Sequence, residues 1–67
     1  MKFIVRDHDN KGKYIANTRD MVDALKIFDE AKTAGRNVEL TAKNPGINQL
    51  VRVPQELVEQ TRRRMNG

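Results

Sequence analysis

Cysteine is absent from this 67-residue sequence, and histidine occurs only once, as His8. The absence of cysteine excludes disulfide bonds, thiolate metal sites and a thiol nucleophile. A single histidine excludes the imidazole pair on which many zinc sites depend. His8 flanks an expected turn, and no nucleophile stands at a spacing that would make it a general base. We therefore expect a protein that is not an enzyme and has no catalytic residues.

Residues 7–12 begin like a calcium-binding loop, because the first and third positions are Asp and the sixth is Gly. The rest of the pattern fails. Lys11 stands where a third oxygen ligand is needed, and Thr18 stands where a bidentate Glu should close the site. We predict a hairpin turn here, with no metal site and no cofactor.

Long apolar runs and aromatic residues are also scarce. The run at the start, Phe3–Val5, is far too short for a signal segment or a membrane span. We therefore expect a soluble, cytoplasmic protein that does not contact membranes. Besides Phe3, the aromatic residues are Tyr14 and Phe28, and all three are expected in the core. This argues against a stacking surface for single-stranded nucleic acid.

The chain is short and basic. Its length indicates one domain, residues 1–67, which would hide only ~60% of its unfolded surface. The net charge is +4, and the pI is about 9.9. Residues 1–35 have seven Lys and Arg against six Asp and Glu, whereas residues 36–67 have six against three. This balance allows attraction to nucleic acid or to an acidic protein without choosing between them.

The clearest pattern runs over residues 38–53 and predicts a β-hairpin. Apolar and polar residues alternate over 38–43, the period of a half-buried strand. Asn44, Pro45 and Gly46 then suit a turn with proline second and a glycine of positive φ third. The predicted opposed pairs are Val38 with Val53, Glu39 with Arg52, and Leu40 with Val51.

An earlier segment predicts a second hairpin. Phe3–Val5 and Tyr14–Ala16 have the apolar character of strands, and residues 9–12 suit a type I turn between them. Pairing about this turn sets Val5 opposite Ala16. On this register, Phe3 and Tyr14 share the face of Val5, and the other face has Ile4, Arg6 and Ile15.

Two amphipathic helices are also predicted. The first covers residues 20–34, capped by Asn17 or Thr18 and ended by Gly35. Its apolar stripe consists of Met21, Ala24, Leu25, Phe28 and Ala31. The second helix covers residues 55–65. Its narrower stripe consists of Leu57, Val58, Thr61 and Met65.

These elements predict a small α+β domain of order ββαββα, with two β-hairpins in one four-stranded sheet and two helices. Both helices could cover one face of the sheet, or the second could cross and cover the other face. The helical connection could also make strand 14–16 and strand 38–43 parallel neighbours. On the predicted register, the face for the first helix consists of Phe3, Val5, Tyr14, Val38, Leu40, Val51 and Val53.

The opposite face combines cations with aliphatic side chains. It consists of Lys2, Ile4, Arg6, Lys13, Ile15, Glu39, Thr41, Lys43, Asn48, Leu50 and Arg52. An aliphatic centre within a polar border is typical of protein interfaces. We therefore predict a non-catalytic protein-binding or regulatory module, such as an inhibitor or adaptor, for an acidic partner. The predicted partner-binding residues are Lys2, Ile4, Arg6, Ile15, Lys43, Leu50 and Arg52.

Two alternatives remain open at this stage. The same face could join two copies of the chain as a homodimeric structural module. Alternatively, the protein could bind nucleic acid, mainly through the phosphate backbone of a duplex. The residues predicted for that role are Arg52, Arg62, Arg63 and Arg64. Cations in the last turn of a helix also complement its dipole, so the arginine run has a purely structural explanation as well.

Overall fold

The computed structural model describes residues 1–66 and confirms the α+β class and the predicted order of elements. The strands are β1 (Lys2–Asp7), β2 (Lys13–Thr18), β3 (Val38–Lys43) and β4 (Val51–Arg52). The helices are α1 (Met21–Thr33) and α2 (Gln55–Asn66), with a short 3-10 helix η1 (His8–Asn10) between β1 and β2. The sheet has the order β2-β1-β3-β4, and each neighbouring pair is antiparallel. Strands β2 and β3 are therefore not neighbours, because β1 lies between them.

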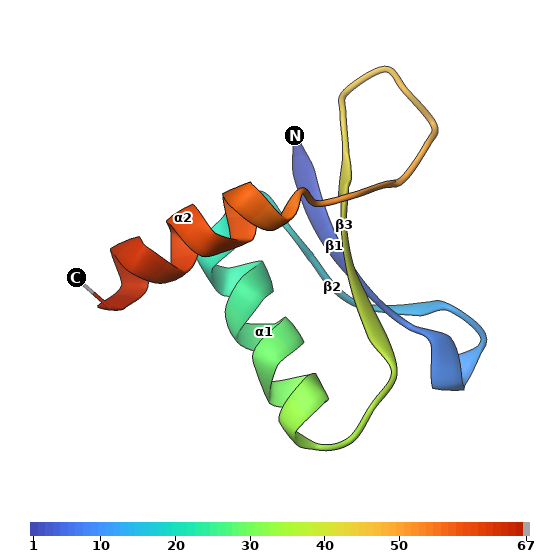
Figure 1. Cartoon of the computed structure of the whole chain (residues 1–67). Coiled ribbons are helices and arrows are strands. Elements are labelled where there is room, and N and C mark those ends of the chain that lie inside the picture. The colour runs from blue at the N-terminus through green and yellow to red at the C-terminus, as the bar shows by residue number, and fades with distance from the viewer. Residues whose placement is uncertain (67) are drawn as a thin grey trace.

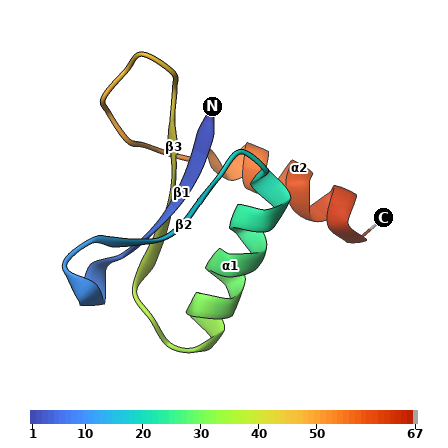
Figure 2. The same ribbon diagram turned by 180° about the vertical axis from the view of Figure 1, so that it is seen from behind.

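Both helices lie on the same side of the sheet (Figures 1 and 2). The core forms where α1 packs on the sheet, with Leu25, Val5 and Leu40 in one cluster, and α2 adds Val58 to the same cluster. The arrangement in which the second helix crosses the sheet is therefore wrong. The opposite face of the sheet, called the open face below, is covered by neither helix.

The ends of α1 follow from local hydrogen bonds. Asp20 is the N-cap, and its carboxylate accepts a hydrogen bond from the backbone N–H of Val22 at 2.9 Å. The predicted cap at residue 17 or 18 is therefore wrong, although the Thr18 hydroxyl accepts a hydrogen bond from the Asp20 N–H. Gly35 ends the helix with φ of 81°, the left-handed conformation that glycine adopts without strain, as the sequence predicts.

The first hairpin has the predicted pair Val5 and Ala16, but its register shifts between Val5 and Arg6. The connection through η1 brings Arg6 opposite Tyr14, so Ile15 becomes the extra residue of a β-bulge. Ile15 packs against the core, whereas Tyr14 is 50% exposed. The prediction had placed Tyr14 in the core and Ile15 on the opposite face, and both placements are wrong.

The second hairpin keeps the predicted turn but not the predicted register. Gly46 has φ of 81°, and the Ile47 N–H donates to the Asn44 carbonyl at 3.2 Å, as in a type II turn. Turns of this type splay the strands they join, and the β3–β4 pair nearest the turn is Ala42 with Val51. The observed pairs are Thr41 with Arg52 and Ala42 with Val51, a shift of two residues from the prediction.

A shift of two residues leaves every side chain on its predicted face, because side chains alternate with a period of two. Val38, Leu40 and Val53 are buried in the core as expected. Glu39 and Arg52 are not directly opposed, but they still share the open face as diagonal neighbours. Val51 is an exception on the helix face, because it is exposed rather than buried.

Candidate binding surface

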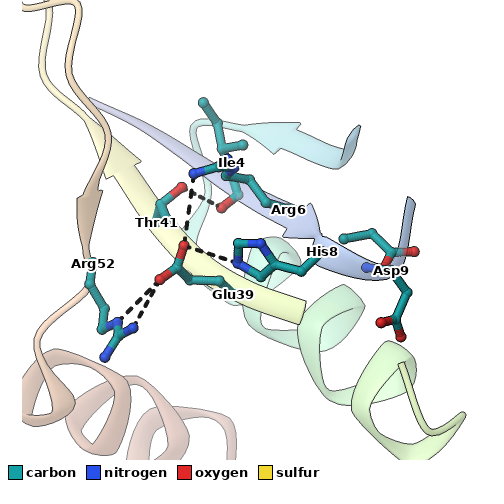
Figure 3. Close-up of polar contacts among 8 residues, drawn as sticks. Ile4, Arg6, His8, Asp9, Glu39, Thr41 and Arg52 are labelled. Atoms are coloured by element: carbon teal, nitrogen blue, oxygen red, sulfur yellow. Dashed lines mark hydrogen bonds and ion pairs between the residues drawn. The ribbon is translucent and has the colours of Figure 1, made fainter. Parts of the chain in front are cut away.

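The centre of the open face is built on Ile4 of β1 and Thr41 of β3, which are directly opposed. Each is only 2% exposed, and the Thr41 hydroxyl donates to the Ile4 carbonyl at 2.9 Å (Figure 3). The prediction that Ile4 is an exposed anchor is therefore wrong, because Ile4 is buried and lies outside the main core. Ile15 packs against that core, and Leu50 is half-buried. Of the three predicted aliphatic anchors, Leu50 is therefore the one that stays partly exposed without packing against the core.

Two arginines and a histidine surround one carboxylate beside this centre, and the set is called the Glu39 cluster: Arg6, His8, Glu39 and Arg52. One oxygen of Glu39 accepts hydrogen bonds from Nε and Nη2 of Arg52 at 3.3 and 3.1 Å. The other lies 3.4 Å from His8 Nε2 and 3.9 Å from Arg6 Nη1 (Figure 3). This carboxylate connects four strand and turn segments, and its single negative charge offsets part of the positive charge of the predicted contact residues Arg6 and Arg52.

Glu39 should make the stability of the domain sensitive to acid. The hydrogen bond from Arg52 lowers the pKa of Glu39 from its usual 4.5, with further lowering by the charges of Arg52 and His8 outweighing its desolvation. A lowered folded-state pKa stabilises the fold above the unfolded pKa, and this contribution is lost as the pH falls through the folded-state pKa. We expect the thermal midpoint of Glu39→Gln to fall less than that of the wild type between about pH 7 and about pH 3.

The matched control for this measurement is Glu59→Gln, which changes an exposed carboxylate on α2. Its midpoint should follow the wild-type pH profile. Equal acid sensitivity of wild type and Glu39→Gln would show that the Glu39 cluster does not stabilise the folded state.

Cations lack carboxylate partners at the opposite end of the open face. Lys2 and Lys43 are directly opposed across β1 and β3, and Arg19 lines the same groove as both lysines. No Asp or Glu lines this groove, and within residues 1–66 none of the three cations forms an ion pair. Directly opposed like charges oppose folding. Lys2, Arg19 and Lys43 are called the cationic end below.

The residues predicted for nucleic-acid binding do not form one basic surface. Arg62 makes two hydrogen bonds to the carboxylate of Asp29, at 2.7 and 2.8 Å, which connect α2 to α1. These bonds raise the pKa of Arg62, so it stays charged. Arg52 is paired with Glu39, whereas Arg63 and Arg64 are exposed near the end of α2, away from the sheet (Figure 1). Two of the four arginines are therefore already neutralised.

Arg19 is a residue of the cationic end that was not predicted, although the sequence contains a signal for it. The predicted pairing of Val5 with Ala16 also sets Phe3 against Thr18, as observed. The next position in the same register sets Lys2 against Arg19. The predicted strand ends at Ala16 and the predicted helix begins at residue 20, so Arg19 lay outside both predicted elements.

Within residues 1–66, no group of His, Asp and Glu side chains is arranged to hold a metal ion. The helices of this part of the chain are also too short or too polar to cross a membrane. Comparison with protein-family models, curated proteins and solved structures gives no match. The function is therefore inferred from the surface of the molecule.

Proposed function

We propose that this protein is a non-catalytic protein-binding module that recognises an acidic partner through the cationic end of its open face. The observation that supports this proposal is the juxtaposition of Lys2, Lys43 and Arg19 around one groove without a carboxylate. The fold gains no ion pair from these three residues, in contrast to Arg6 and Arg52 in the Glu39 cluster. An acidic partner would supply the missing negative charge and would be attracted over a distance by the net positive charge.

Two features favour a protein partner over nucleic acid. The groove at the cationic end is also lined by Ile47, which is 51% exposed, and an aliphatic side chain gains nothing from a phosphate backbone. Tyr14 is the only exposed aromatic side chain among residues 1–66, so this part of the chain has no row of aromatic rings for base stacking.

The proposal is tested by measuring the fluorescence anisotropy of a labelled Glu-rich peptide and of a labelled DNA duplex as the protein is added. We expect the peptide to bind at low ionic strength and to be released by added salt. Lys43→Glu should weaken peptide binding by about tenfold or more, because it replaces an attraction by a repulsion. The new carboxylate would face Lys2 and relieve the like-charge contact, so we expect this variant to fold at least as well as the wild type.

Lys26→Glu is the matched control, because it makes the same change of charge at an exposed position on α1 that lies outside the groove. It should bind the peptide nearly as the wild type does. Equal weakening by both variants would mean that only the net charge matters, and the proposed site would be wrong. Failure of the peptide to bind at low salt would overturn the proposal. Tighter binding of the duplex, lost on changing Arg63 and Arg64, would favour nucleic acid.

A further inference from the structure

The loop that joins β3 to β4 forms one side of the groove at the cationic end. Residues 44–50 arch away from the sheet before the chain returns at Val51 (Figures 1 and 2). The groove has a volume of about 660 Å³. Its lining consists of Met1, Lys2, Arg19, Lys43, Asn44, Pro45, Gly46, Ile47 and Asn48.

The loop stays apart from the sheet for a reason visible in its hydrogen bonds. The bond from the Ile47 N–H to the Asn44 carbonyl is the one backbone hydrogen bond that residues 44–50 make within the described part of the chain. The type II turn directs the arms apart, so the residues after it do not extend the ladder with β3. Backbone and side-chain groups of the loop are thus left at the surface beside Lys2 and Lys43.

Aliphatic and cationic groups occur together in this groove. Ile47 and Met1 are each more than half exposed, and Pro45 adds to the apolar lining of the groove. Apolar side chains of this size usually gain about 1.5–3 kcal/mol when they are fully removed from water. Exposed aliphatic groups beside uncompensated cations indicate a ligand with both an apolar and an anionic part.

We propose that the groove holds an extended acidic segment of a partner protein, with one aliphatic side chain seated against Ile47. Carboxylates of the segment on either side of that aliphatic residue pair with Lys2, Lys43 and Arg19. This inference rests on the proposed function and adds to it the chemical class of the recognised segment. Its selectivity comes from two contributions to affinity, negative charge for the cationic end and one apolar side chain for Ile47.

A second groove provides a comparison, because its arginines are paired with carboxylates. It has a volume of about 480 Å³ and lies between β3, the start of α2 and α1. Its cations include Arg52 and Arg62, but Glu39 and Asp29 line the same space and neutralise them. Lys32 also lines this groove, so its Lys, Arg, Asp and Glu side chains leave a net charge of +1, against +3 at the cationic end. An acidic segment is therefore attracted more strongly to the cationic end.

The inference is tested with two labelled acidic peptides that differ at one central position, Leu in one and Ser in the other. The wild type should bind the Leu peptide about tenfold more tightly than the Ser peptide. Ile47→Ser should abolish this preference while leaving the weaker, charge-dependent binding of both peptides in place. Met65→Ser is the matched control, because it removes an exposed aliphatic side chain from α2 and should keep the preference. Thermal melts of both variants check that they are folded.

The outcomes separate this inference from the proposed function. If both peptides bind the wild type equally, or if Ile47→Ser keeps the preference for Leu, the groove does not seat an aliphatic residue, and the acidic-partner proposal stands alone. If neither peptide binds at low ionic strength, both proposals are overturned. If Lys43→Glu weakens both peptides and Ile47→Ser removes only the Leu preference, the two parts of the groove act as proposed.

Discussion

Leu25→Ala should remove about 3–4 kcal/mol from the free energy of unfolding, the typical loss for a fully buried leucine. Leu25 is 0% exposed and packs in the cluster that joins α1 to Val5 and Leu40 of the sheet. Small domains have only about 5–15 kcal/mol of stability in total, so this variant should be close to unfolded at moderate temperature. Urea denaturation followed by circular dichroism measures the difference.

Phe28→Ala provides the comparison, because the spacing of apolar residues makes Phe28 an equally plausible centre of this helix. In the structure Phe28 is only half-buried, and the Lys32 ammonium lies 5.4 Å from the centroid of its ring. We expect a smaller loss for Phe28→Ala than for Leu25→Ala, since less area returns to water. The reverse order would mean that α1 is rotated about its axis relative to the sheet.

Ile4→Ala should cost about 2–4 kcal/mol, although Ile4 lies on the face that no helix covers. The loss is expected because Ile4 is only 2% exposed and lies directly opposite Thr41, so its truncation leaves a cavity. A binding anchor on a surface would respond differently, with a loss of about 0.5 kcal/mol or less on truncation. The same denaturation measurement distinguishes the two roles.

Ile47→Ala is the matched control for this variant, because Ile47 is an isoleucine of the same size that is 51% exposed. Its free energy of unfolding should stay within about 0.5 kcal/mol of the wild type. A negligible effect of Ile4→Ala would show that Ile4 is a surface residue. It would then support the interface predicted from the sequence, which has an aliphatic centre.

Local patterns were sufficient to predict most of the fold. The positive φ angles of Gly35 and Gly46 follow from where a helix must end and a turn must form. The face of each residue in β3 and β4 was predicted correctly even though the register was not, because an error of two residues preserves alternation. In the first hairpin, the bulge at Ile15 is a shift of one residue, and the assignments of Tyr14 and Ile15 failed with it.

The candidate site depended on contacts that local patterns do not contain. The opposition of Lys2 and Lys43 requires that β1 pair with β3, and alternation within each strand says nothing about which strands become neighbours. The contacts of Glu39 depend on the same pairing of β1 with β3. Glu39 was expected to pair with Arg52 alone, but it also lies close to Arg6 of β1 and to His8, which follows β1. Charge balance on the open face could therefore be assigned only after the strand order was known.

The position of β1 in the middle of the sheet has a consequence for how the chain folds. Its pairing with β2 is local, but its pairing with β3 joins residues such as Ile4 and Thr41, which are separated by 37 positions. The entropy of closing that loop must be overcome before any of the β1–β3 contacts can form. During synthesis β1 leaves the ribosome well before β3, so its second edge stays unpaired until β3 has been made. The cationic end forms only when these two strands pair.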